Sequence, residues 1–278
     1  MKLHYLGTGA AEGWPAVFCD CPACRRAREL GGKNIRTRAQ ILIDDELLID
    51  LGPDTFAHAA MYGLDLGAVP HVLVTHSHSD HFYPEDLVFR AEPYGHNAGR
   101  QPMTLYGNRK VGQLLDYSRS IYDDTGCLNN CLAFAEVTAF TSFTAGSFFV
   151  VPLPAVHDAS EDCLLYEITS LRDGKRILYA NDTAMLPEAD FDYLAGRRLD
   201  LVSLDCTMGG EASCSSHMSL ADCVRVRERL LAQGSADENT IFVITHFSHN
   251  GKLLHDELCT AASAHGLLTA FDGLRREL

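Results

Sequence analysis

A histidine-rich stretch, Thr75-His76-Ser77-His78-Ser79-Asp80-His81, directly follows the apolar run Val72-Leu73-Val74. The run predicts a buried strand, and four potential metal ligands lie within six residues at its end. In extended chain, residues two apart point the same way. The first two histidines can therefore bind one ion, while the aspartate and the last histidine turn toward a second. This pattern constrains the fold strongly, because it predicts a binuclear metal site at the end of a strand.

Three more potential ligands, His157, Asp182 and His246, each follow a predicted strand. In an α/β domain such strand ends converge on one rim, where loops carry binding groups on a rigid scaffold. We expect the following division: one ion on His76, His78 and His157, the other on Asp80, His81 and His246, with Asp182 bridging them. Imidazole and carboxylate ligands favour Zn, Mn or Fe over Ca or Mg. Two such ions ~3.5–4 Å apart can share a hydroxide, so hydrolysis is the expected reaction.

The length and composition of the chain limit its class. With 278 residues, of which 46% are hydrophobic, it can bury a large core. We expect one domain over residues 1–278, because no linker-like run divides it. Neither a signal-peptide core nor an apolar stretch of ~20 residues is present, which predicts a soluble, cytoplasmic protein without a membrane partner. The formal charge of -14 disfavours extended nucleic-acid binding but is compatible with a small anionic substrate held by metal ions.

Short apolar runs alternate with helical patterns along the chain. The predicted strands cover 40–43, 47–49, 72–74, 148–153, 164–168, 177–180, 199–204 and 241–245, and the predicted helices cover 53–62, 84–90, 109–120, 186–196, 220–233 and 252–265. The segment 41–49 indicates an antiparallel hairpin about an acidic turn. The early loop Gly7-Thr8-Gly9 lacks the rest of a nucleotide-binding fingerprint. We therefore expect a layered α/β domain with two sheets between helices and no nucleotide cofactor.

A second ligand cluster lies near the amino terminus. Cys19, Cys21 and Cys24 have C-x-C-x-x-C spacing, which can place three thiolates around a tetrahedral ion and leaves one position for another residue. His249, three residues after His246, is the expected fourth ligand. The segment 245–249 would then serve an active-site ion and a structural zinc ion.

The H-x-H-x-D-H stretch, with a later histidine, a later aspartate and a final histidine, resembles the metallo-β-lactamase superfamily. The resemblance implies a four-layer αββα sandwich and a binuclear hydrolase. Asp50 matches an early aspartate that supports a ligand rather than binding metal. An aspartate at position 182 resembles the branches that hydrolyse phosphodiesters and thioesters.

The cysteine cluster and the segments 6–13, 180–183, 204–206 and 271–273 are similar to the PhnP family of phosphoribosyl cyclic phosphodiesterases and, more distantly, to a quinone-biosynthesis branch. That resemblance implies that His217 assists at the scissile phosphate, as a proton donor or a phosphate ligand. We expect Asp80 to be a catalytic residue as well. Residues 95–147, with Tyr117, Tyr122, Asp123 and Asp124, are expected to form an insertion that overhangs the metal rim and sets substrate choice.

Three functions remain open from the sequence. The first is a metal-dependent phosphodiesterase acting on a small cyclic or nucleotide-like substrate. The second is another hydrolase of the superfamily, namely a lactonase, a thioesterase or a tRNA-processing nuclease, of which the nuclease fits least because no basic arm is present. The third is a non-catalytic metal-binding or carrier protein. By analogy with related hydrolases, a homodimer is one expected assembly.

Overall fold

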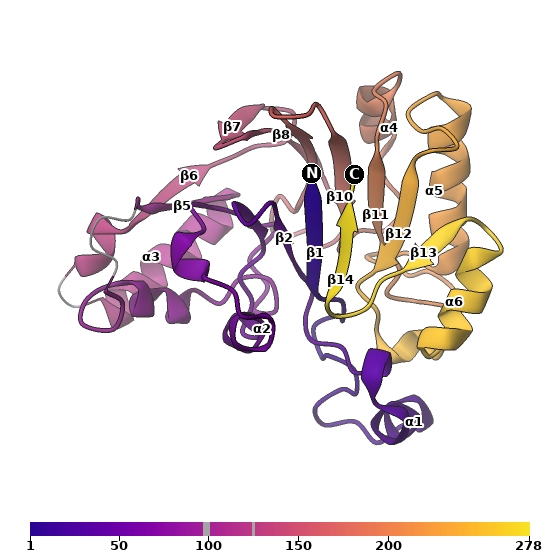
Figure 1. The fold of residues 1–278 in the computed structure, drawn as a ribbon, viewed down its shortest axis with the longest axis horizontal. Helices are drawn as coiled ribbons and strands as arrows, with labels where there is room; N and C mark the ends of the chain where they lie inside the picture. Colours follow the sequence, from indigo (N-terminus) through magenta and orange to yellow (C-terminus); the bar gives the residue numbers. More distant parts are fainter. Residues whose placement is uncertain (97–100, 124–125) are drawn as a thin grey trace.

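Two seven-stranded sheets pack face to face between two layers of helices in the computed structural model, which describes residues 1–96, 101–123 and 126–278. Figure 1 shows α2 and α3 outside one sheet and α4, α5 and α6 outside the other, with α1 beyond one end of the sheets. The two termini lie side by side, because the first and last strands pair. The arrangement confirms the expected αββα sandwich.

The first sheet has the strand order β14-β1-β2-β3-β4-β5-β6. Its strands are β1 (Lys2–Gly7), β2 (Gln40–Ile43), β3 (Leu47–Ile49), β4 (His71–Leu73), β5 (Met103–Gly107), β6 (Leu132–Glu136) and β14 (Leu274–Glu277). The pairs from β14 to β3 are antiparallel, and those from β3 to β6 are parallel. The predicted hairpin is confirmed: β2 pairs with β3 across Asp44 and Asp45, which both have positive φ, as a tight I′ turn requires.

The second sheet has the order β13-β12-β11-β10-β9-β8-β7. Its strands are β7 (Phe143–Ala145), β8 (Phe148–Pro154), β9 (Leu164–Ser170), β10 (Arg176–Ala180), β11 (Leu201–Asp205), β12 (Ile241–Thr245) and β13 (Leu267–Thr269). The pairs from β7 to β10 are antiparallel, and those from β10 to β13 are parallel. The parallel strands therefore end at a common edge, where loops can gather ligands.

The described helices pack against the rest of the molecule through buried stripes, and all but α1 cover the outer faces of the sheets. They are α1 (Pro22–Leu30), α2 (Thr55–Tyr62), α3 (Arg109–Tyr122), α4 (Glu188–Leu194), α5 (Leu220–Ala232) and α6 (His255–Ser263), with short 3-10 turns η1 (Gly32–Asn34), η2 (Leu66–Ala68), η3 (Pro84–Arg90), η4 (Cys127–Asn130) and η5 (His249–Gly251). Val111 and Leu115, one turn apart on α3, are buried. Helix α1 lies outside the predicted helices, although Pro22 starts it and Cys21 caps it.

Alternate residues of the first sheet enter two different cores. Leu3, Tyr5 and Ile41 face the second sheet and pack in the large core between the sheets. Leu42 and Leu105 point the other way, into a smaller core under α2 and α3. Burying each large apolar side chain contributes about 1.5–3 kcal/mol. The two cores together therefore determine which residues of each strand face the second sheet and which face the helices.

The segment 95–147, expected to be an insertion over the metal rim, contributes β5, α3, β6 and β7 to the layers described above. Strands β5 and β6 extend the parallel edge of the first sheet, and Tyr117 and Tyr122 are exposed on α3. Asp124, named with them in the sequence, lies outside the described residues. Among the described helices, none combines the length and the apolar character needed to cross a bilayer.

Candidate metal centre

The first group of predicted ligands gathers at the end of β4. His76 Nε2 lies 2.9 Å from His78 Nδ1, and His157 Nε2, from the loop after β8, lies 3.2 Å from the same atom. Around a tetrahedral ion with metal–nitrogen bonds of about 2.05 Å, ligand nitrogens stand about 3.3 Å apart. The three nitrogen atoms therefore converge at a separation that suits one shared ion.

The second group lies beside the first and is buried. His81 Nε2 lies 3.0 Å from Asp80 Oδ2, and it also contacts Asp182. His246 Nε2, from the end of β12, lies 3.1 Å from Asp182 Oδ2. Both Nε2 atoms are buried without a hydrogen-bond partner of suitable geometry, which is costly for a polar atom unless a ligand such as a metal ion satisfies it.

Asp182 occupies the position between the two groups. Its Oδ2 atom lies 3.9 Å from His76 Nε2 as well as 3.1 Å from His246 Nε2. A carboxylate so placed can bridge two ions. The structure thus brings together all seven residues in the predicted division, while their role as metal ligands stays a prediction.

The imidazoles of the second group are also held at their other nitrogen atoms. His81 Nδ1 lies 2.7 Å from Asp50 Oδ2, and His246 Nδ1 lies 2.8 Å from Thr207 Oγ1. Asp50 is itself fixed by the backbone N–H and hydroxyl of Thr75, which both donate to its Oδ1 atom. Contacts of this kind orient the ring and select which nitrogen faces a metal ion.

The backbone is strained at three site residues that follow strands. Asp50, Asp182 and His246 all have positive φ, at 67°, 52° and 61°. Residues other than glycine avoid this region at a cost of order 1 kcal/mol or more, and such strain clusters at functional sites. Gly52 permits the close packing next to Asp80, because an added Cβ would lie 2.0 Å from the Asp80 carbonyl oxygen.

His217 lies at the edge of the second group, on the loop before α5. Its Nδ1 atom is 2.9 Å from Asp205 Oδ2 and 3.4 Å from Asp182 Oδ1. Burial disfavours the charged imidazole, but the hydrogen bond and attraction to Asp205 outweigh it, with Asp182 adding to the effect, and raise the pKa of His217 to about 9. Asp205 is itself held by the backbone N–H of Met218, which donates to its Oδ1 atom.

The electrostatics of Asp182 favour its charged form. Burial by itself would raise the pKa of this carboxyl, but His246 and His81 outweigh that effect and hold the pKa well below its usual range. Asp182 is therefore a buried, negatively charged carboxylate, which suits a ligand that bridges two cations.

A pocket of about 310 Å³ opens above both groups. The ligands that line it are His78, Asp80, His157, Asp182 and His246, and the other lining residues are Ala10, Ala11, Glu12, Thr207, Met208, His217, Ser248 and Asn250. The lining combines these polar groups with the apolar side chains of Ala10, Ala11 and Met208, and His217 lines the same space as the predicted metal ligands. None of the described residues that line this pocket is a lysine or an arginine.

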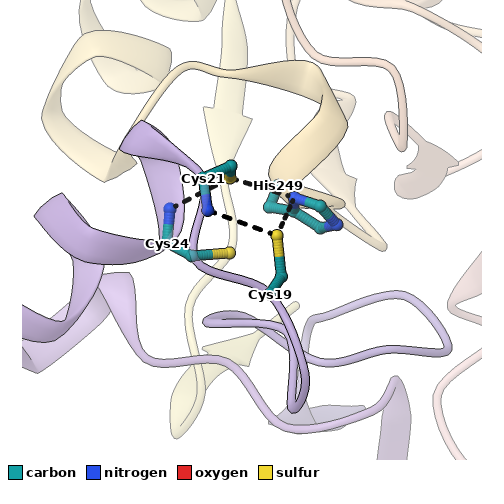
Figure 2. A group of neighbouring side chains, drawn as sticks. All are labelled: Cys19, Cys21, Cys24 and His249. Atoms are coloured by element: carbon teal, nitrogen blue, oxygen red, sulfur yellow. Dashed lines mark hydrogen bonds between the residues drawn. The ribbon is translucent and has the colours of Figure 1, made fainter.

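The three cysteines of the amino-terminal cluster and His249 gather as predicted, as Figure 2 shows, while their role as zinc ligands stays a prediction. Sγ of Cys19 and Sγ of Cys21 lie 3.7 Å and 3.4 Å from His249 Nδ1, and Cys24 is buried beside them. For zinc bonds of about 2.3 Å to sulfur and 2.0–2.1 Å to nitrogen, the tetrahedral edge between the two ligands is about 3.6 Å. The four side chains therefore fit one zinc ion.

The start of α1 favours a thiolate in this cluster. Cys21 caps the helix and accepts from the Cys24 N–H. Burial opposes ionisation, but the Cys24 N–H and the His249 contact outweigh it and lower the pKa of Cys21 to about 6. Glu12 then connects the two sites, because it accepts from Ser248 Oγ, lies 3.6 Å from His249 Nε2 and lines the pocket.

Asp205 and Thr207 hold the site histidines His217 and His246, and the sequence analysis assigns neither of them a role. Asp205 ends β11, and its position after an apolar run is the same signal that identified Asp182. Thr207 has no such signal, because a threonine two residues beyond a strand is ordinary. Its role depends on a contact with His246, 39 positions away in the sequence.

The comparisons with known proteins agree with this architecture. A diphosphatase of the PhnP family has a similar structure, with a TM-score of 0.77 and 24% identity over 100% of this chain and 97% of that one. Zn²⁺-bound PqqB from Methylobacterium extorquens has a TM-score of 0.74 and 20% sequence identity, and the match covers 100% of both chains. Human short-form tRNase Z has a TM-score of 0.69 and 17% identity, and the match covers 100% of this chain and 99% of that one. At these identities the likeness concerns the fold.

Among curated sequences, an octanoyltransferase of Porphyromonas gingivalis (strain ATCC BAA-308 / W83) is 37% identical over 83 residues. These residues are 29% of this chain and span only 16% of that protein. The family match is broader: residues 46–247 match the Beta-lactamase superfamily domain, and this segment holds all seven predicted metal ligands and His217. The chain therefore belongs to the beta-lactamase superfamily and has the metallo-β-lactamase fold of its hydrolases.

Proposed function

We propose that this protein is a binuclear metal-dependent phosphodiesterase that acts on a small phosphodiester. The observation that carries the proposal is the two adjacent ligand groups with Asp182 between them, opening into one pocket with His217. Neutral imidazoles with a few carboxylates suit Zn, Mn or Fe. His76, His78 and His157 would hold one ion, and Asp80, His81 and His246 the other. A third ion, zinc, would occupy the cysteine cluster.

Bound ions would supply an acidified water and would polarise the phosphoryl group. The chain's own residues supply orientation and a proton. Asp50 and Thr207 hold the rings of His81 and His246 through their Nδ1 atoms, so that both Nε2 atoms face Asp182. Burial of Asp182 keeps bulk water away from the charged centre and strengthens its electrostatic interactions.

His217 would protonate the leaving oxygen. Asp205 accepts a hydrogen bond from its Nδ1 atom, which leaves Nε2 as the nitrogen that can donate. The paired carboxylate favours the protonated ring, as a general acid requires. An acid in this position matters most when the leaving group is an alkoxide, because an alkoxide needs a proton to depart.

The size and charge of the pocket support a small substrate with one phosphodiester group. Its volume of about 310 Å³ is at the lower end of small-molecule sites. The described lining has no lysine or arginine, so extra phosphates of a polymer would find no cation there. The likeness to a PhnP-family diphosphatase supports a phosphoryl rather than an acyl substrate.

The proposal can be tested with metal-stripped protein that is reloaded with Mn, Zn or Fe. We expect hydrolysis of bis(p-nitrophenyl) phosphate and of 2′,3′-cyclic nucleotides, and little turnover of an acyl lactone or a thioester. His217→Gln should slow cleavage about 10²–10⁴-fold when the leaving group is an alkoxide, and less when it is p-nitrophenolate. His265→Gln, on an exposed histidine, is the matched control. A metal-saturated protein that hydrolyses no phosphodiester would refute the proposal.

A further inference from the structure

The three histidines of the first ligand group come from two separate loops. His76 and His78 follow β4 in the first sheet, and His157 follows β8 in the second. Their common geometry therefore depends on how the loop 155–163 is fixed against the loop 75–81. A backbone hydrogen bond, from Leu164 N to Thr75 O at 2.9 Å, marks one end of this contact.

Asp158 holds the ring of His78. Its Oδ2 atom lies 3.2 Å from His78 Nε2, on the far side of the ring from the nitrogen that faces His76 and His157. A carboxylate only accepts hydrogen bonds, so this contact places the ring proton on Nε2 and leaves the Nδ1 lone pair for a metal ion. The backbone N–H and hydroxyl of Ser160 both donate to Asp158 and fix it in turn.

Glu161 fastens the two loops together. It accepts from the backbone N–H of Ser77 at 3.0 Å and from the Ser77 hydroxyl at 2.7 Å, directly between His76 and His78. Its side chain is 1% exposed, whereas that of Asp158 is 27% exposed. A charged carboxylate that is so deeply buried must be held by several donors, and here the donors belong to the histidine loop.

The start of α3 completes this support. Asn108 caps α3 through its Oδ1 atom and donates from Nδ2 to Glu161 Oε2 at 2.9 Å. Lys110, in the first turn, donates to Ser160 at 2.7 Å and lies 3.7 Å from Glu161 Oε1 and 3.9 Å from Asp158 Oδ2. The segment 95–147 thus supports the candidate metal centre through the start of helix α3. None of its described residues lines the pocket.

We propose that Asp158 and Glu161 are positioning residues that preorganise the first metal subsite, with Asp158 selecting the nitrogen of His78 that binds and Glu161 holding the two ligand loops in register. This inference rests on the proposed function, which makes the three histidines metal ligands. Contacts of this kind change metal affinity about 10–100-fold when they are lost. The second subsite should be little affected, because its rings are held by Asp50 and Thr207.

The test is a Co²⁺ titration of the full-length protein, followed by absorption. Thiolate-to-cobalt charge-transfer bands report the cysteine site and serve as an internal control for folding. Weaker d–d bands report the two histidine sites, and His78→Ala and His246→Ala assign them. Asp158→Asn and Glu161→Gln are compared with Asp162→Asn, an exposed neighbour on the same loop. We expect the first two variants to bind Co²⁺ at the first subsite about 10–100-fold more weakly, and Asp162→Asn to match the wild type.

Two further measurements separate positioning from general damage. Nitrogen NMR of the imidazoles should show His78 as the Nε2–H tautomer in the wild type and a mixture in Asp158→Asn. Excess metal should restore kcat in both variants. Should Glu161→Gln fail to fold, the partly exposed Asp158 variant decides the question.

The possible failures are distinguishable. A wild-type protein that takes up no Co²⁺ at the histidine groups would refute the proposed function. Normal wild-type uptake that is unchanged in Asp158→Asn, or a variant that weakens both subsites equally, would refute only the positioning role.

Discussion

Asp190 makes the stability of this protein depend on pH in a way that can be calculated. It lies in α4, is fully buried, and neither carboxylate oxygen has a hydrogen-bond partner. Burial is the cause that raises its pKa from 3.8 to about 7. A rise of about three units corresponds to roughly 4 kcal/mol of differential stability between the two protonation states.

The sign follows from which state loses its proton first. In the unfolded chain the carboxyl ionises near pH 4, whereas in the folded protein it keeps its proton until about pH 7. The contribution of this group is therefore fully present below pH 4 and declines as the pH rises through 7. By linkage, about 2–3 kcal/mol of it should disappear between pH 5 and pH 8.

The assay is denaturant unfolding of the wild type, Asp190→Asn and Asp192→Asn at pH 5 and pH 8, with the metal concentration held constant. Asp192 is an exposed residue of the same helix and is the matched control. Relative to the wild type, Asp190→Asn should gain about 2–3 kcal/mol of unfolding free energy on going from pH 5 to pH 8, and Asp192→Asn should gain nothing measurable. If all three proteins show parallel pH dependence, Asp190 is ionised and stabilised in the folded state, and the reasoning is wrong.

Three other predictions concern the ligands. Cys21→Ser should lower the bound metal by one ion per chain, measured by elemental analysis, and lower the unfolding temperature while the histidine groups keep their ions. Thr207→Val removes the hydroxyl that holds His246 and should weaken metal binding at the second subsite about 10–100-fold, measured by chelator competition. Chelator treatment should abolish hydrolysis, and added Mn or Zn should restore it, as a rate assay would show.

The sequence predicts those parts of this fold whose signal is local. The apolar runs at 40–43, 47–49 and 241–245 coincide with β2, β3 and β12, because both faces of these strands are buried. Strand β14, Leu274–Glu277, is invisible to the same reasoning, since its residues are mostly charged and it forms by pairing with β1 across the whole chain. Helix α1 lacks the stripe of large apolar residues that marks a helix in a sequence, because it buries only Ala23, Cys24 and Ala27.

The same distinction between local and long-range signals applies to the residues of the candidate site. The predicted metal ligands could be found from the sequence, because a histidine or aspartate directly after an apolar strand is a local pattern, repeated here at several strand ends. Residues that choose the nitrogen of each ring are contributed by distant segments. Asp50 reaches His81 from 31 positions away, Thr207 reaches His246 from 39, and Asp158 reaches His78 from 80.

This division has a physical basis in how the αββα sandwich builds its site. Strand ends place the ligands at one edge of the sheets, but they leave each imidazole free to turn and to exchange its proton between two nitrogens. Only a partner on a neighbouring loop removes that freedom, and the partner can be a carboxylate, a hydroxyl or a backbone carbonyl. Since several chemical groups serve equally, no single residue type marks these positions. We therefore expect metal affinity to depend on packing between loops, and mutations at Asp158 or Glu161 test that dependence without changing a predicted ligand.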